Sequence, residues 1–131
     1  MKLIVWNCQG LGALWLVQTL TEVVKLHRLG LVFISKTKCK GRRYDRLKEK
    51  FNYHRIGVDA IGRSGGLLLL WRKDVEVWLQ SFSVNHIDAT IKYVDCHEIW
   101  RFTGFYGNPE TSKREETWEL LRRLAQGSIR P

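Results

Sequence analysis

An apolar run, an amphipathic segment and a second apolar run follow one another at the start of the chain, and this order constrains the fold most strongly. Residues 3–6 and 31–35 have the length and composition of buried strands. Residues 13–28 repeat apolar side chains at helical spacing, and Gly30 is expected to end that helix. Two strands joined by a crossover helix lie parallel in one sheet. The sequence therefore predicts an α/β unit at the start of the chain.

The rest of the chain is dominated by strand patterns. A charged helix or turn is expected over residues 41–50, and a final helix follows the capping-box residues Ser112 and Glu115. Alternating apolar residues predict one buried face in two strands, at Val75, Val77 and Leu79 and at Ile87, Ala89 and Ile91. The expected strands cover residues 53–58, 67–71, 75–82, 87–94 and 98–106. The prediction is a single domain, residues 1–131, of the α/β class with mixed sheets.

Charge narrows the classes of function. The chain has 131 residues, 44% of them apolar, a formal net charge of +9 and a pI near 9.8. This balance favours a polyanionic partner, with nucleic acid ahead of an anionic membrane; a protein that is basic by chance is the alternative. The cysteines are Cys8, Cys39 and Cys96, whose odd number and wide spacing favour reduced thiols. With no signal-like or membrane-spanning run, we expect an intracellular protein, nuclear or cytoplasmic, and not a secreted one.

Five segments, in matching order and spacing, resemble the endonuclease/exonuclease/phosphatase family. Within that family the pattern is that of the apurinic-endonuclease-like domain of plant LINE-type (non-LTR) retrotransposon proteins. The resemblance implies a four-layer α/β/β/α sandwich, of which this chain is the N-terminal half. It also implies magnesium-assisted hydrolysis of DNA phosphodiesters. The segments are KLIVWNCQGLG (2–12), FISKTK (33–38), GRSGGLLLLW (62–71), NHID (85–88) and WRFTGFYGNPETSKREETWELLRRL (100–124).

The resemblance also implies roles for three positions. Asn7 matches the asparagine that follows the first strand and helps to arrange the metal site. Tyr106 matches the tyrosine whose hydroxyl lies near the attacked phosphate. The family's principal metal-binding glutamate directly precedes Thr-Lys at the end of the second strand, and here that position is Lys36. Asn7 and Tyr106 are therefore expected as relics of a catalytic site.

Two departures from the family pattern predict little or no catalysis. Magnesium prefers carboxylate oxygens, and an ammonium about 4 Å from a divalent ion is repelled by roughly 8 kcal/mol at an effective dielectric of 20, before screening. The Mg²⁺ of the family is accordingly expected to bind weakly or not at all. Family members also continue into further catalytic segments, whereas this sequence ends at Pro131, so we expect a truncated domain.

The basic run over residues 36–50, after the second strand, has two interpretations. It is either a solvated helix face or a patch that contacts phosphates. Only Asp45 and Glu49 oppose it. Arg63, before Ser64-Gly65-Gly66, is a further candidate contact; those glycines either cradle a phosphate or let the chain enter a tightly packed strand. The run comprises Lys36, Lys38, Lys40, Arg42, Arg43, Arg46, Lys48 and Lys50.

Three functional hypotheses remain open. The first is an inactive fragment of a retrotransposon-type, metal-dependent DNA endonuclease. The second is a basic module that binds DNA or RNA without cutting it. The third is a relic without function, which would self-associate through sheet surface left exposed. No membrane partner is expected.

Overall fold

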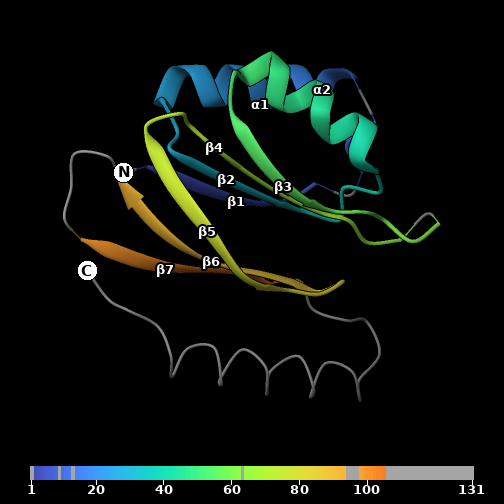
Figure 1. Cartoon of the computed structure of the whole chain (residues 1–131). Coiled ribbons are helices and arrows are strands. Elements are labelled where there is room, and N and C mark those ends of the chain that lie inside the picture. The colour runs from blue at the N-terminus through green and yellow to red at the C-terminus, as the bar shows by residue number, and fades with distance from the viewer. Residues whose placement is uncertain (1, 9, 13, 63, 94–97, 106–131) are drawn as a thin grey trace. The chain divides into compact units, whose positions relative to one another are not determined.

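The computed structural model describes residues 2–8, 10–12, 14–62, 64–93 and 98–105, and the chain divides into two compact units, Met1–Lys73 and Asp74–Pro131 (Figure 1). We call them the first and second unit. The architecture is mixed α/β with two sheets, as the sequence predicts. The elements in chain order are β1 (Leu3–Asn7), α1 (Leu14–His27), β2 (Leu31–Ser35), α2 (Gly41–Phe51), β3 (His54–Val58), β4 (Leu67–Trp71), β5 (Val75–Phe82), β6 (His86–Tyr93) and β7 (Ile99–Phe105).

The first unit contains a four-stranded sheet in the order β1-β2-β4-β3. β1 and β2 are parallel, as predicted, whereas β4 is antiparallel to both β2 and β3. Both helices lie over the same face of this sheet (Figure 1). β2 and β4 occupy the centre, with a strand on either side, and every residue of both is buried. Their continuous apolar runs follow from that central position.

The core of the first unit forms between the helices and alternate residues of the central strands. From the strands come Val32 and Ile34 of β2 and the corresponding residues of β4. The helices add one apolar stripe each, as helical spacing requires. Loop residues such as Leu11 close the core at one end. The helical and sheet members of this cluster include Val17, Leu20, Val24, Val32, Ile34, Tyr44, Leu47, Leu68 and Leu70.

Two local expectations in the first unit are wrong. Residues 3–6 were expected to form a fully buried strand, but Leu3 is 48% exposed and Val5 is 59% exposed. β1 lies at the edge of its sheet in the described part of the chain, so only its alternate residues reach the core. The helix end also differs, because Arg28 (φ 48°), not Gly30, takes the left-handed conformation.

The second unit contains the antiparallel sheet β5-β6-β7. The alternation predicted for β6 is confirmed, since Ile87, Ala89 and Ile91 are buried. The alternation predicted for β5 is wrong beyond its start: Val75 is buried but Leu79 is exposed. Leu79 is still in register with the buried Ala89, but β5 lies at the edge of its sheet in the described part of the chain, so it has a neighbouring strand on one side only.

Strand and helix boundaries agree with the sequence analysis within two residues wherever the structure describes them. The predicted charged helix exists as α2, and β4 and β5 have the predicted limits. The final helix expected after Ser112 lies outside the described residues, as does Tyr106. The single-domain assignment stays a prediction.

Candidate functional site

Asn7 and Lys36 lie at the same edge of the first sheet. Asn7, the last residue of β1, is in register with Ser35, the last residue of β2, because the two strands are parallel. The loops that follow these strands stay hydrogen-bonded to each other. Gly10 donates its N–H to the carbonyl of Lys36 (2.7 Å), and Leu11 donates to that of Thr37 (2.8 Å). The backbone at Lys36 is therefore fixed beside the end of β1.

The loop over residues 36–38 has an unusual backbone. Lys36 (φ 53°) and Lys38 (φ 55°) both lie in the left-handed region, which costs an L-residue about 1–2 kcal/mol. Thr37 between them is fully buried. Thr37 and Lys38 donate their N–H groups to the carbonyls of Gly66 (3.2 Å) and Gly65 (2.8 Å). Two surrounding segments thus hold this loop in place and offset its conformational cost.

Gly66 is required by this arrangement. It has φ +95°, and a Cβ built on it would lie 2.2 Å from the Thr37 hydroxyl oxygen. Gly66 therefore lets two segments of the chain approach closely, which favours tight packing over a phosphate cradle as the role of this glycine. Arg63 itself lies outside the described residues.

Tyr44 is the buried polar anchor of the same loop. Its hydroxyl lies 2.6 Å from the Thr37 hydroxyl, 3.1 Å from the Cys39 carbonyl and 3.0 Å from the Val58 carbonyl. Burial raises the pKa of Tyr44 to about 12, so the hydroxyl remains a proton donor. The sequence analysis missed this residue, although Tyr44 and Leu47 have the i, i+3 spacing of a buried helix stripe.

Asp45, one of the two acidic residues within the basic run, is engaged by Arg55 and not by the arginines beside it. The Asp45 carboxylate accepts hydrogen bonds from the guanidinium of Arg55 on β3, at 3.0 Å from Nε and 2.9 Å from a terminal nitrogen. Lys48 lies 4.0 Å from the same carboxylate. By contrast, Arg42 and Arg46 are exposed and form no ion pair with any residue that the structure describes. Arg42 and Arg46 therefore present exposed, unpaired positive charge near the start of α2.

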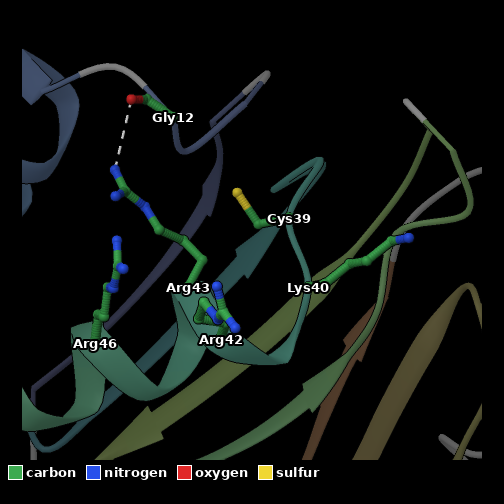
Figure 2. A pocket seen from close by; sticks show the side chains of 6 residues that line it. All are labelled: Gly12, Cys39, Lys40, Arg42, Arg43 and Arg46. Atoms are coloured by element: carbon green, nitrogen blue, oxygen red, sulfur yellow. Dashed lines mark hydrogen bonds between the residues drawn. The ribbon is translucent and has the colours of Figure 1, made fainter.

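Four of the predicted nucleic-acid-binding residues line one pocket, which we call the basic pocket (Figure 2). Its volume is about 360 Å³. Arg43 crosses from α2 to the loop after β1, where its terminal nitrogen donates to the carbonyls of Leu11 (3.1 Å) and Gly12 (3.5 Å). That contact ties the two walls together. The lining residues are Gly12, Cys39, Lys40, Arg42, Arg43 and Arg46.

The remaining predicted site residues lie elsewhere. Lys36 and Lys38 belong to the adjoining loop and do not line the basic pocket. The side chain of Lys38 lies close to the loop after β1, since a Cβ added to Gly10 would be 3.6 Å from the Cδ of Lys38. Asn7 is exposed at the end of β1.

The described residues do not fit a divalent metal. Lys36, a cation, stands where the resemblance expects a carboxylate ligand. Within residues 2–8, 10–12, 14–62, 64–93 and 98–105, no three His, Cys, Asp or Glu side chains group in a way that could hold a metal ion. Nor does any helix in those ranges have the length and apolarity to cross a membrane.

Comparison with solved structures identifies the fold. The chain is similar to a conserved protein of unknown function from Enterococcus faecalis (TM-score 0.66, 12% identity), with 95% of this chain and 61% of that one covered. It is also similar to an AP endonuclease from Archaeoglobus fulgidus (TM-score 0.63, 17% identity), with 96% of this chain and 50% of that one covered. A third match is a 3′-5′ exonuclease from Neisseria meningitidis (TM-score 0.59, 14% identity), with 97% of this chain and 52% of that one covered.

These similarities establish a fold shared with AP endonucleases and exonucleases. The chain spans about half to three fifths of the length of the structures it matches. No family model matches the sequence, and no curated protein matches it.

Proposed function

We propose that this chain binds nucleic acid through the basic surface of its first unit and does not hydrolyse it. We further propose that it derives from a LINE-type retrotransposon endonuclease whose metal-binding glutamate has become Lys36. The single observation that carries the binding proposal is the basic pocket, which Lys40 and three arginines line while Asp45 is engaged by Arg55. The fold shared with nucleases makes nucleic acid the favoured polyanion.

Phosphate contacts account for the chemistry of this surface. Arginine presents a planar fork of donors that matches phosphate oxygens, and lysine adds a mobile point charge. Lys38 and Lys40 are exposed beside Arg42 and Arg46, so all four side chains are accessible to a nucleic-acid backbone. Contacts of this kind position the strand without reading its sequence.

The absence of hydrolysis follows from the residue at position 36. Metal-dependent phosphodiester cleavage needs carboxylates that hold the cation and stabilise developing charge. An ammonium at that position repels the cation and supplies no ligand. It attracts a phosphate instead, so the same replacement that removes catalysis favours binding.

Salt dependence tests the binding proposal. With about four phosphate contacts, the logarithm of the association constant should fall with the logarithm of salt concentration with a slope of roughly −3 to −4. Fluorescence anisotropy with labelled duplex and single-stranded DNA measures this slope. An affinity that does not change over a roughly fourfold increase in salt concentration, from about 50 to about 200 mM, would contradict the proposal.

A nicking assay tests the absence of hydrolysis. Supercoiled plasmid is incubated with the pure protein and magnesium, beside an EDTA control, and no nicked circles are expected. EDTA-sensitive nicking that disappears in Asn7→Ala or Tyr106→Phe would show that Lys36 is compatible with catalysis.

A further inference from the structure

The basic pocket is a shallow, open hollow bordered by three segments, which distinguishes it from an ordinary basic helix face. Its walls come from the start of α2, from residues 39–40 and from Gly12 after β1. Figure 2 shows Arg43 and Arg46 extending from α2 in the same direction, toward the side of Gly12, whereas Lys40 points away from them. A shallow hollow of this kind admits a small group at the end of a ligand.

The electrostatics of the basic pocket favour an anion of high charge. Arg42 and Arg46 are four residues apart on α2, a spacing at which like charges repel and destabilise a helix. Arg43 uses one terminal nitrogen for the loop carbonyls, but its Nε is buried without a hydrogen-bond partner in the described part of the chain. Buried donors are normally satisfied. An anion in the basic pocket would relieve the repulsion between Arg42 and Arg46 and would accept hydrogen bonds from their exposed guanidinium groups.

We propose that the basic pocket holds the terminal phosphate monoester of a nucleic-acid strand. This inference rests on the proposed function and names its ligand. An internal phosphodiester carries one charge and offers two free oxygens. A terminal monoester carries about −1.5 to −2 charges near pH 7 and three free oxygens, so it gains more from a cluster of arginines. Its oxygens match the forked donors of the arginines.

Anisotropy with three otherwise identical single-stranded DNA oligonucleotides tests the inference. One carries a 5′-phosphate, one a 3′-phosphate and one only hydroxyl ends, with the dye placed away from the tested end. We expect one phosphorylated oligonucleotide to bind about tenfold more tightly than the hydroxyl form, as charge-assisted bidentate contacts allow. Inorganic phosphate at millimolar concentration should reduce this preference.

The double variant Arg42→Ala/Arg46→Ala should lose the preference for a phosphorylated end. The matched control is Lys25→Ala/Lys73→Ala, which removes the same charge from exposed positions outside both the basic run and the basic pocket. The control should keep the preference. Circular dichroism and thermal unfolding verify that both variants fold.

Each contrary result has a distinct meaning. Equal, salt-dependent binding of all three oligonucleotides would overturn the terminal-phosphate inference and leave the proposed function intact. A preference that survives Arg42→Ala/Arg46→Ala would place the site outside the basic pocket. A mononucleotide that binds as tightly as the phosphorylated oligonucleotide would replace a nucleic-acid end with a free nucleotide. Absence of binding to every oligonucleotide would overturn both proposals.

Discussion

Arg101 in the second unit is paired with a carboxylate, whereas Arg42 and Arg46 in the first unit are not. In the second unit, Arg101 binds the fully buried carboxylate of Asp88 through two nitrogens, with Nε at 2.9 Å, and Thr103 adds its hydroxyl at 3.3 Å. In the first unit, Arg42 and Arg46 lie exposed beside the basic pocket with no carboxylate partner among the described residues. The contrast teaches that an arginine committed to the fold is paired with a carboxylate, whereas arginines available to a ligand are exposed and unpaired. Stability and binding should therefore depend on different arginines.

The largest expected effect lies in the paired region. Arg101→Ala leaves the Asp88 carboxylate buried without its main partner, which should cost about 3–5 kcal/mol of unfolding free energy. Urea denaturation measures the loss. The double variant Arg101→Ala/Asp88→Ala is the control and should recover part of it. If Arg101→Ala lowered the unfolding free energy by less than about 0.5 kcal/mol, the Arg101–Asp88 pair would not be important for the fold.

The next effect concerns the loop that adjoins the basic pocket. Gly66→Ala introduces a Cβ against the Thr37 hydroxyl at a positive φ, and should cost about 2–3 kcal/mol in unfolding free energy. Gly62→Ala is the matched control, because that glycine also has a positive φ (+60°) but no atom within 4 Å of the added Cβ. If both variants lose the same stability, backbone strain alone matters and the close approach to Thr37 does not.

A smaller effect is a dependence of folding stability on pH, which we expect from His86 in the second unit. Burial lowers the pKa of His86 below its ordinary 6.5, and its ring nitrogens lie 3.0 Å and 2.6 Å from the Ser81 and Ser83 hydroxyls. The unfolded chain therefore binds a proton more readily than the folded one, so stability is complete above pH 6.5 and falls as the pH drops below it.

Urea midpoints at several pH values between 7.5 and 5 measure this dependence. The slope should be shallower in His86→Gln than in the wild type, since glutamine does not titrate. Identical slopes would show that other groups account for the acid sensitivity.

The smallest effect on stability should come from the unpaired arginines. Arg42→Ala/Arg46→Ala should change the unfolding free energy by no more than about 0.5 kcal/mol, or raise it slightly by removing like-charge repulsion. The same variant should weaken nucleic-acid binding, whereas Arg101→Ala, examined under conditions where it remains folded, should not. Thermal unfolding and anisotropy on the same samples compare the two properties. A large loss of stability in the double arginine variant would mean that these side chains serve the fold.

Sequence patterns predicted the elements because periodicity is local. The parallel pairing of β1 and β2 followed from a strand, a helix and a strand in that order, and the limits of β4 followed from one apolar run. The basic run was visible as composition, and the resemblance directed attention to Lys36. These signals lie within a few consecutive residues, so no knowledge of distant contacts was needed.

The tertiary structure decided which of these residues form a site. Arg43 reaches Gly12 across 31 positions of sequence, and Asp45 on α2 is engaged by Arg55 from β3. Gly66 is indispensable only because Thr37 packs against it. Nothing in the sequence alone indicated the burial of Asp88 or the exposure of Val5, since both depend on strand position within a sheet. The sequence by itself determined where charge and apolar surface occur along the chain; folding decided which charges are paired and which remain available, because pairing depends on proximity in space.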